Sequence, residues 1–525
     1  MQDSRVTSPP AWKYWVLPSV GGLIFIALLA VLVFTPLSVK LLGDAGIGWH
    51  IRTGQLILAD HAVPHVDPFS TQIGRPWFAW EWLYDVAVGK LEAWCGLNGV
   101  VWFTAVIIAA VFAWTFKQLL ARGTNLFVAL LLILLAISAS TIHFLARPHV
   151  LSWLFTVAWF EILDSTERSG YSDGTVSSSQ WLWVLPILML LWVNIHGAFV
   201  LGFVLLGIFW MGSLWMWLTL KASRIEESLQ KIAARKRVRQ LTLVGLASVL
   251  SSFVNPYRWN LHAHIYSYLT NRFLMEHIDE FQSPSFHGLA QNCFLLLLLV
   301  SMAILIARGR SLRMSSAVLV LFAIYAGLYA SRNIPFSSIL LVLIVGPLVP
   351  SLGPSGFAQR MTVIDQRLRG HLWPVVATVA TLMIAANGGR VGSAQWMDAH
   401  FNPQRMPVDA VNFLERQGVR SPIFSPDYWG GYVIYRLYPR NKVVVDDRHD
   451  FYGEGFLQGY LTTIHMERGW DEILRARDCL LLPTRSALAV NVSKLPEWKT
   501  LYSDNVATVF VPARNREDTD RVPNR

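Results

Sequence analysis

Long apolar stretches alternate with short polar segments up to about residue 390 of the chain. Most stretches contain roughly 16 to 22 mainly apolar residues, and a helix needs about 20 to cross about 30 Å of hydrocarbon. The pattern therefore predicts an α-helical polytopic membrane protein with about eleven spans, several of them short. The predicted spans lie at about residues 14–35, 99–116, 125–142, 149–163, 181–193, 197–219, 240–254, 291–307, 314–330, 335–350 and 372–388.

From about residue 390 the apolar stretches shorten and charged residues are interspersed among them. A helix-like sequence, MPVDAVNFLERQG, is followed by strand-like sequences with helix-like GGYVIYRLY between them. The strand-like sequences are SPIFS, KVVVDD, DCLLLP, KTLYS and VATVFV. This mixture predicts an α/β domain of about 130 residues. We therefore expect a polytopic domain over residues 1–389, with a large first external loop over residues 36–98, and an α/β domain over residues 390–525.

Composition and charge fix the expected orientation. The chain has 525 residues, of which 54% are hydrophobic and 15% charged, which is too apolar for an ordinary soluble protein. Its net charge of +10 comes mainly from Lys and Arg in alternate loops. The positive-inside rule then predicts a cytoplasmic N-terminus and, with an odd number of spans, a C-terminal domain outside.

The basic sequence RIEESLQKIAARKRVRQ is expected to be a cytosolic loop that contacts anionic lipid headgroups, not a nucleic-acid site. The first span lacks a convincing cleavage site after its basic start, so we expect an uncleaved anchor and a multi-pass protein of the inner (plasma) membrane. The three Cys residues are too few and too scattered for a disulfide framework.

Ionisable and amide side chains gather in the segments that this orientation places outside. Charged groups at the edge of hydrocarbon are costly unless they pair or line a wet cavity, so their convergence predicts a functional site. The first external loop contributes Asp44, His50, Arg52, Asp67 and Glu81. Later turns contribute His143, Arg147 and His149, then Asn194 and His196, then Asn255, Tyr257 and Arg258, and finally Arg332 and Asn333.

Each of these residues also has a structural explanation. Arg side chains near helix ends, such as Arg147 and Arg332, often extend toward lipid headgroups. Asn194 and His196 lie in a tight turn, where such side chains cap backbone groups. Asp44 is placed to cap a helix that contains GWHIRTGQLILA. The Trp-rich PWFAWEWLY is typical of an interfacial aromatic belt.

The order of motifs in the first loop resembles that of the GT-C superfamily of membrane glycosyltransferases. An Asp soon after the first span is followed by GWHIRTGQLI, VPHVDPFS and WEWLYDV. The later ARPHV, WVNIHG, VNPY and SRNIPF are similar to loops of bacterial members, and together these motifs cover most of the first 390 residues. These enzymes take a sugar from a polyprenyl-phosphate carrier on the outer membrane face. The resemblance implies a glycosyltransferase whose partners are a polyprenyl-phosphate-linked sugar, membrane lipids and an acceptor that the sequence leaves open.

Glycosyl transfer to a hydroxyl needs a carboxylate that accepts a proton and cations that stabilise the departing phosphate. The resemblance implies that Asp44 is the catalytic carboxylate. Glu81 is a second catalytic candidate, which orients the acceptor or shares a divalent metal, Mg²⁺ or Mn²⁺, with Asp44. The expected substrate-binding residues are His50, His143, Arg147, Asn194, His196, Arg258 and Arg332.

A second resemblance lies in the C-terminal domain. The sequence FSPDYWGGYVIYRLYPRNKVVVDDR resembles the region around the WWDYG motif of the oligosaccharyltransferase catalytic subunit. It implies that Asp427, Tyr428 and Trp429 bind the acceptor. Because this chain has PDYWGGY in place of that motif, transfer to an Asn sequon does not follow from the resemblance.

Two other classes of function stay open. A transporter or flippase would line its pathway with these charges, although such sites usually lie near the bilayer midplane and not at one face. A non-catalytic envelope assembly protein would act through the external domain. Its ligand or metal cluster would be Asp446, Asp447, Arg448, His449 and Asp450, which are otherwise solvated charges at a strand end.

Overall fold

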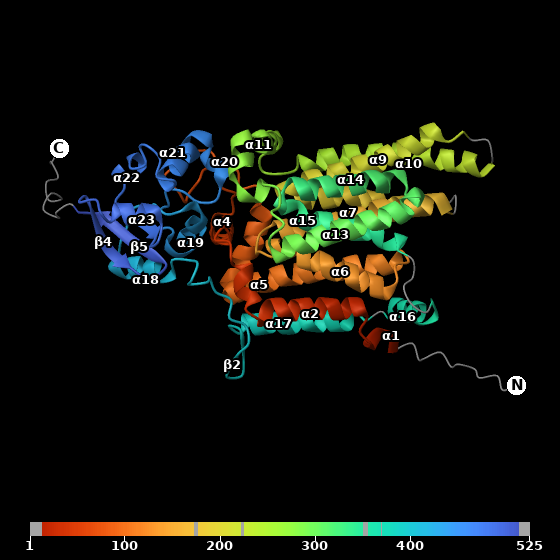
Figure 1. Ribbon diagram of the computed structural model, residues 1–525, viewed down its shortest axis with the longest axis horizontal. Coiled ribbons are helices and arrows are strands. Elements are labelled where there is room, and N and C mark those ends of the chain that lie inside the picture. The colour runs from red at the N-terminus through yellow and green to blue at the C-terminus, as the bar shows by residue number, and fades with distance from the viewer. Residues whose placement is uncertain (1–12, 173–176, 222–224, 350–354, 369, 514–525) are drawn as a thin grey trace. The chain divides into compact units, whose positions relative to one another are not determined.

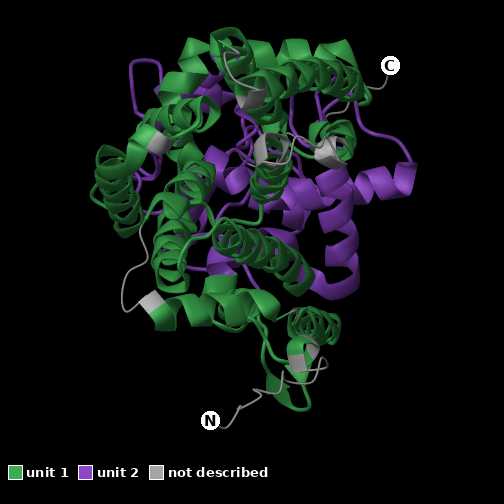
Figure 2. Ribbon diagram, turned by 90° about the vertical axis from the view of Figure 1, so that its right-hand side faces the viewer, with its two compact units in different colours: residues 1–38, 98–398 green, residues 39–97, 399–525 purple. Residues whose placement is uncertain are grey.

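The computed structural model describes residues 13–172, 177–221, 225–349, 355–368 and 370–513. The chain is mostly helical and divides into two compact units, which Figure 2 shows in different colours. Unit 1 comprises residues 1–38 and 98–398, and unit 2 comprises residues 39–97 and 399–525. The sequence grouped the first loop with the membrane-spanning part, whereas the structure combines it with the C-terminal segment in one unit.

Unit 1 consists of helices joined by short 3-10 turns and carries one small hairpin. Its α-helices are α1 (Lys13–Val16), α2 (Val20–Phe34), most of α5 (Trp82–Ala121), α6 (Leu126–Ser140), α7 (His149–Ser172), α8 (Val184–Val193), α9 (Val200–Thr219), α10 (Ile225–Ser252), α11 (Trp259–Thr270), α12 (Arg272–His277), α13 (Leu289–Arg308), α14 (Met314–Tyr329), α15 (Ile334–Val345), α16 (Ser355–Arg367) and α17 (Leu372–Ala386). The 3-10 turns are η1 (Thr141–His143), η2 (Ser177–Trp183), η3 (Gly197–Phe199), η4 (Asp279–Phe281), η5 (Gly309–Ser311), η6 (Ser331–Asn333) and η7 (Gly346–Leu348). The hairpin pairs β1 (Arg390–Val391) with β2 (Ala394–Gln395), and α3 (Leu37–Leu41) lies at the boundary of the two units.

The longer helices of unit 1 run side by side in Figure 1, with α6 against α13 and α15, and α9 against α10 and α14. Local sequence sets their ends. The Ser19 hydroxyl accepts a hydrogen bond from the Gly22 backbone N–H at 3.1 Å at the start of α2. In α5, Gly96 adopts φ 59° and interrupts the helix, and the boundary between the two units follows directly after it.

Five helices of the described residues are long and apolar enough to cross a membrane, or up to six if one bent pair is counted as a span. The five are Trp82–Ala121, Leu126–His143, Gly197–Thr219, Leu289–Arg308 and Ser331–Leu348, and the bent pair is Gly356–Arg367 with Leu372–Ala386. Shorter apolar helices occupy Val20–Phe34, Gln180–Val193 and Met314–Tyr329. These helices are those of a multi-pass membrane protein, while the predicted total of about eleven spans is not confirmed by this count.

Unit 2 combines helices with a small sheet. Its helices are α4 (Ile47–Asp60), the first part of α5, α18 (Val408–Gln417), α19 (Asp427–Leu437), α20 (His449–Tyr452), α21 (Glu454–Ile464), α22 (Glu472–Arg475) and α23 (Ala487–Val492). Its strands are β3 (Leu480–Pro483), β4 (Trp498–Ser503) and β5 (Ala507–Pro512). The sheet is antiparallel with the order β3-β5-β4.

Single bridges extend this sheet in the parallel direction beyond β3. Phe424 bridges to Leu480, and Ile423 bridges to Val443. The first loop then adds to the same edge, because Ser70 bridges to Val443. The helices α4 and α19 also touch closely, since a Cβ atom added at Gly48 would lie only 2.1 Å from the Gly431 carbonyl oxygen. Unit 2 is therefore built jointly by its two distant chain segments.

Candidate active site

Polar side chains from several turns of unit 1 gather in one cluster. They lie in and after η1, at the start of α7, in the turn between α8 and η3, and in η4 and η6. Electrostatic interactions connect them to one another. This cluster, called the basic cluster below, consists of His143, Arg147, His149, His196, Glu280 and Arg332.

His196 is held as a neutral imidazole in the turn before η3. Its Nδ1 atom accepts a hydrogen bond from the Ala198 backbone N–H at 3.3 Å and lies 2.9 Å from the Ser152 hydroxyl. The Trp192 indole in turn donates to Ser152 Oγ at 2.8 Å. Because a ring nitrogen that accepts an N–H bond carries no proton, the ring proton is on Nε2. Burial, followed by the charge of Arg332, lowers the pKa of His196 well below its usual value.

His143 and His149 are neighbours in the connection between α6 and α7. Their ring centres are 6.0 Å apart, and His149 Nε2 lies 2.9 Å from the His143 carbonyl oxygen. Since a carbonyl only accepts, His149 Nε2 carries the N–H. His143 is 6% exposed, and its buried Nε2 has no hydrogen-bond partner among the described residues. A buried polar atom of this kind is costly, so it indicates a position where a ligand or a water binds.

Hydrogen bonds of the preceding residue, Ser331, fix the backbone at Arg332, and the Arg332 guanidinium lies over the face of an aromatic ring. The Ser331 backbone N–H donates to the Gln282 carbonyl at 2.9 Å, and the Ser331 hydroxyl donates to the Glu280 carbonyl at 3.1 Å. The guanidinium carbon lies 4.6 Å from the centre of the Phe281 ring. Within the part of the chain that the structure describes, the Arg332 side chain forms no hydrogen bond and no ion pair.

Glu280 is the carboxylate of the basic cluster, and the sequence analysis did not single it out. Burial alone raises a carboxyl pKa, but the charge of Arg332, then His143 and Arg147, outweighs burial and lowers the pKa of Glu280. Glu280 is therefore ionised at neutral pH. In the sequence, Glu280 is distinguished only by its acidic neighbour Asp279, in a polar segment that is predicted to lie outside.

Asn194 and Arg258 are two further residues that the sequence predicts to bind substrate. The Asn194 amide donates to the Leu190 carbonyl at 2.8 Å and to the Val254 carbonyl at 2.9 Å, so it ties the end of α8 to the segment after α10. Arg258 is exposed at the start of α11, where it adopts φ 50°. The structure thus gives Asn194 a structural contact and exposes Arg258, and substrate binding by either residue stays a prediction.

In unit 2, Asp44 is half-buried just before α4. Its Oδ1 accepts a hydrogen bond from the Gly46 backbone N–H at 2.8 Å. The N-cap of α4 is Gly46 itself, so Asp44 forms a turn ahead of the helix and does not cap it directly. Arg52, from the same helix, donates through Nε to the Tyr435 carbonyl at 2.8 Å, which ties α4 to α19.

His50 lies between two carboxylates at the start of α5. Its Nδ1 is 2.6 Å from Asp85 Oδ1, and its Nε2 is 3.7 Å from Glu81 Oε2. The side chains of His50 and Asp85 are 0% exposed, whereas that of Glu81 is 12% exposed. The Trp49 ring stacks on the imidazole at 3.6 Å. The complete burial of His50 argues against the direct substrate contact that the sequence suggested. Of the three side chains, Glu81 is the one that solvent reaches.

The predicted acidic cluster after the strand-like KVVVDD is an internal ion pair. Arg448 Nε and Nη2 donate to the two Asp446 carboxylate oxygens at 2.8 and 2.7 Å. Arg448 Nη1 donates to Asp67 Oδ1 at 2.7 Å. Asp446 is 0% exposed and Arg448 is 3% exposed, with the guanidinium 4.7 Å from the Trp77 ring centre. These contacts have the character of a buried structural network and not of an open ligand site.

The segment expected to bind the acceptor is only partly accessible. Tyr428 is 55% exposed, but Trp429 is 2% exposed and donates from its indole to the Arg405 carbonyl at 2.8 Å. Asp427 Oδ2 lies 2.7 Å from His449 Nε2. Burial opposes the charge on both groups, but their mutual contact lowers the pKa of Asp427 and raises that of His449. Asp427 and Tyr428 thus remain candidates for acceptor contact, while Trp429 belongs to the core.

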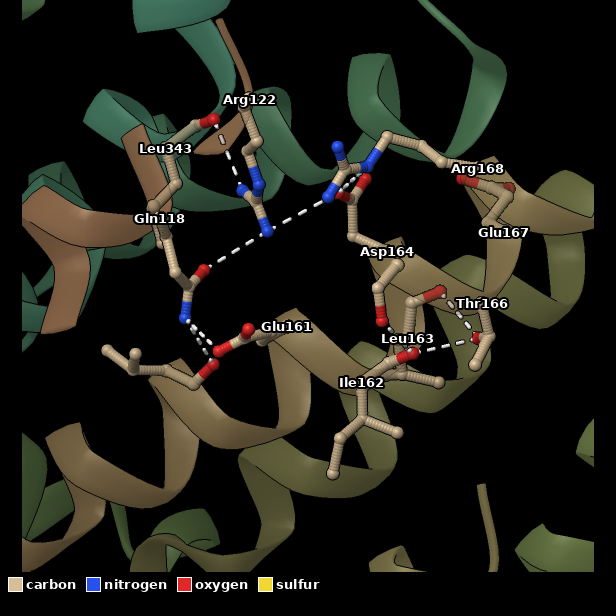
Figure 3. Close-up of polar contacts among 12 residues, drawn as sticks. Gln118, Arg122, Glu161, Ile162, Leu163, Asp164, Thr166, Glu167, Arg168 and Leu343 are labelled. Atoms are coloured by element: carbon tan, nitrogen blue, oxygen red, sulfur yellow. Dashed lines mark hydrogen bonds and ion pairs between the residues drawn. The ribbon is translucent and has the colours of Figure 1, made fainter. Parts of the chain in front are cut away.

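A second charged network lies at the far end of α7, about 22 Å along the helix from His149. Figure 3 shows Arg122 bonded to the Gln118 amide oxygen and paired with Asp164, at 3.1 and 3.3 Å respectively. Arg168 Nε also pairs with Asp164, at 2.9 Å. Gln118 in turn donates to Glu161 at 2.9 Å. Gln118 of α5 and Arg122 directly after it thus connect this end of α5 to Glu161 and Asp164 of α7, whereas Arg168 pairs with Asp164 within α7 itself.

The described residues contain no group of three or more His, Cys, Asp or Glu side chains that could hold a metal ion. The predicted Mg²⁺ or Mn²⁺ site at Asp44 and Glu81 therefore stays a prediction.

Comparison with known proteins shows which solved structures the chain is similar to. No protein-family model matches the chain, and a search of curated proteins gave no match. Among solved structures, the chain is similar to the oligosaccharyltransferase of Archaeoglobus fulgidus in its apo form, with a TM-score of 0.51 and 11% identity over 88% of this chain and 69% of that one. A second structure of that enzyme, with Zn and sulfate, gives a TM-score of 0.43 at 11% identity over 94% and 72%.

The chain is also similar to ArnT from Cupriavidus metallidurans bound to undecaprenyl phosphate, with a TM-score of 0.47 and 12% identity over 93% of this chain and 97% of that one. The first of these likenesses shows that the chain shares the fold of that oligosaccharyltransferase. The resemblance in the order of the sequence motifs is thus confirmed for the fold. The reaction has to be argued from the residues of this chain.

Proposed function

We propose that this protein is a membrane glycosyltransferase that moves a sugar from a polyprenyl-phosphate carrier to an acceptor hydroxyl on the outer membrane face. The fold supports the class of protein. The distribution of Lys and Arg supports the orientation, with the N-terminus in the cytoplasm and residues 390–525 outside.

One observation carries the proposal. The Arg332 guanidinium rests on the Phe281 ring while its N–H donors have no acceptor among the described residues. A planar guanidinium binds phosphate oxygens through paired donors, and a ring beneath it holds it in place without using them. His143 Nε2 is a further buried polar atom of the same cluster without a partner. A lipid-linked phosphate supplies acceptors for these groups.

The charge of the basic cluster agrees with an anionic ligand. Arg147 and Arg332 are positive, Glu280 is negative, and His196 is neutral because its Nδ1 accepts a backbone hydrogen bond. Positive charge and fixed N–H donors stabilise the charge that develops on a departing phosphate. Arg147 and Arg332 are therefore the proposed phosphate-binding residues, with His143 and His196 assisting.

The proposed reaction uses the carboxylates of unit 2. The acceptor oxygen bonds to the anomeric carbon, and the bond from that carbon to the phosphate oxygen breaks, with its electron pair leaving on the phosphate. The acceptor proton passes to Asp44, a transfer worth about 10² to 10⁴ in rate. Glu81 is proposed to accept a hydrogen bond from the acceptor hydroxyl, and Asp427 with Tyr428 to contact the rest of the acceptor.

The test is binding of polyprenyl phosphate to the purified, detergent-solubilised protein. We expect Arg332→Ala to weaken binding about tenfold or more, because charged hydrogen bonds contribute about 1.5 to 3 kcal/mol. The matched control is Arg272→Ala, since Arg272 is an exposed Arg on α12 that pairs with Glu276 at 2.6 Å. Equal binding by both variants and the parent would overturn the phosphate site.

Transfer is tested separately, by following radiolabelled lipid-linked sugar in membranes that contain the protein. Loss of label from the lipid and its appearance on an acceptor would support the glycosyltransferase. Binding of the lipid with movement across liposome bilayers, but without transfer, would instead favour the flippase alternative.

A further inference from the structure

The arrangement of Asp85, His50 and Glu81 is a line of three ionisable groups that runs from the interior of unit 2 toward its surface. Asp85 and His50 are 0% exposed and lie 2.6 Å apart, while Glu81 is 12% exposed and lies 3.7 Å from the other ring nitrogen. The short contact fixes the ring, because a carboxylate that accepts from Nδ1 selects one orientation of the imidazole. The outer nitrogen, Nε2, is then directed at Glu81.

Helix geometry explains why these groups meet. Glu81 directly precedes α5 and its carbonyl accepts from the Asp85 backbone N–H at 3.0 Å, so the two residues are one helical turn apart and their side chains project from the same side. His50 comes from α4, which packs against this start of α5: a Cβ atom at Gly54 would lie 1.8 Å from the Asp85 carbonyl oxygen. The close backbone contact brings the imidazole between the two carboxylates.

We propose that Asp85 and His50 are a positioning pair that keeps Glu81 ionised and oriented toward the acceptor hydroxyl. This rests on the proposed function. Burial of Asp85 favours a proton on His50, because a buried carboxylate is stabilised by a positive partner in contact with it. The imidazolium in turn faces Glu81, and a positive neighbour at that distance favours its charged form. An ionised Glu81 accepts a hydrogen bond from a hydroxyl, whereas a protonated one competes as a donor.

The other groups around His50 are mainly aromatic. Trp49 stacks on its ring at 3.6 Å, and Tyr84 meets it edge-on at 5.3 Å. From the C-terminal segment, Asp447 accepts a hydrogen bond from the Trp49 indole at 3.0 Å, and the Arg448 guanidinium lies 5.8 Å from the Trp49 ring centre. Asp85 contacts one ring nitrogen of the imidazole, and Glu81 lies nearest the other in the contacts described above.

The decisive experiment measures the ionisation of Glu81 and does not depend on activity. A carbodiimide labels protonated carboxyl groups, and mass spectrometry of the folded, detergent-solubilised protein gives the pH at which half of Glu81 is labelled. We expect Asp85→Asn to raise that midpoint by about one pH unit, because loss of a nearby positive charge typically moves a carboxyl by one to three units. His50→Gln should raise it similarly.

The matched control is Glu92→Gln, which changes a carboxylate of α5 that contacts Gln55 and Tyr435. Its Glu81 midpoint should equal that of the parent. An unchanged midpoint in Asp85→Asn, with the control also unchanged, would overturn the proposal. If Asp85→Asn does not fold, Asp85→Glu keeps the charge and His50→Gln decides the question.

Transfer activity separates this inference from the proposed function. In Asp85→Asn we expect transfer to fall about tenfold or more, the value of a charged hydrogen bond, with polyprenyl phosphate binding within about twofold of the parent. A parent that transfers no sugar contradicts the proposed function, and the labelling midpoint still tests the pair. A shifted midpoint with full transfer activity would show that Glu81 does not contact the acceptor.

Discussion

Arg448 Nη1 donates a hydrogen bond to Asp67 Oδ1 over 2.7 Å, although the two residues are 381 positions apart. Both are buried, with 3% and 4% of their surfaces exposed. Burial by itself raises the pKa of Asp67, but the Arg448 charge and hydrogen bonds from Ser70 and Phe69 outweigh it and lower that pKa. The pair therefore joins the first loop to the C-terminal segment by a contact that persists at neutral pH.

Asp67→Asn should destabilise unit 2, because it removes the negative partner of a buried cation. The expected loss is about 1.5 to 3 kcal/mol, the value of a hydrogen bond to a charged group, since Asp446 continues to pair with Arg448. Thermal melting of the purified protein measures the effect. The control is Asp471→Asn, which breaks the exposed pair with Arg475 and should leave the melting temperature nearly unchanged. Equal melting of both variants would contradict a stabilising role.

Arg332→Lys tests geometry separately from charge. Lysine keeps the positive charge but lacks the planar fork that binds two phosphate oxygens, so polyprenyl phosphate binding should weaken by about tenfold. The same change at Arg147 should also weaken binding. The matched control is Arg272→Lys at the exposed pair with Glu276. If binding tolerates Lys at both Arg147 and Arg332, these residues contact lipid headgroups and not the substrate.

Asp44→Asn should give a folded, lipid-binding protein without transfer activity. The amide oxygen of Asn can still accept the hydrogen bond from the Gly46 backbone N–H, but it does not accept a proton from a hydroxyl. Radiolabelled sugar transfer and polyprenyl phosphate binding are measured side by side. Transfer within a few fold of the parent would contradict the assignment of Asp44 as the catalytic carboxylate, and Glu81 would then be the leading candidate.

The contact of Asp427 with His449 should make stability depend on pH. His449 has a pKa raised above 6.5, so its contribution is complete below that pH and is lost as pH rises through the raised value. Asp427 has a pKa lowered below 3.8, so its contribution is present above pH 3.8 and is lost as pH falls through the lowered value. The melting temperature should therefore decline above pH 6.5 in the parent and less so in His449→Gln. The exposed His465 provides the matched control, His465→Gln.

The predicted orientation is tested with reporter fusions after Gly392 and after Arg239. The positive-inside rule predicts that these positions lie on opposite sides of the membrane. Reporters active only in the cytosol and only outside it should therefore give opposite results at the two sites. Labelling of both positions from the same side would remove the assignment of the basic cluster to the outer face.

Sequence reasoning identified the turns of unit 1 because Arg and His at helix ends stand out against apolar spans. It found His143, Arg147, His196 and Arg332, which the structure brings together. It missed Glu280, since an acidic residue in a polar segment looks like any solvated charge until its basic neighbours are known. Local patterns therefore predict positive groups in such a chain better than their counter-charges.

Local sequence patterns did not predict that residues 39–97 and 399–525 form one unit. The bridge between Ser70 and Val443 depends on long-range contacts, and neither segment has a partner specified by its own sequence. For the same reason, the burial of His50 and Trp429 was not foreseen. The sequences around these two residues contain polar residues and Gly and have the character of a surface, and only tertiary packing covers the two side chains.

The shared construction of unit 2 has a consequence for biosynthesis. Residues 39–97 leave the ribosome long before residue 399, and at about 5 to 20 residues per second the interval is on the order of 15 to 60 s. During this time Asp67 lacks Arg448, and the edge around Ser70 lacks Val443. The early segment must therefore stay soluble and unaggregated while the intervening helices are inserted. Because of this delay, we expect folding factors in the compartment where unit 2 matures to bind its early segment, residues 39–97, until the rest of the unit is made.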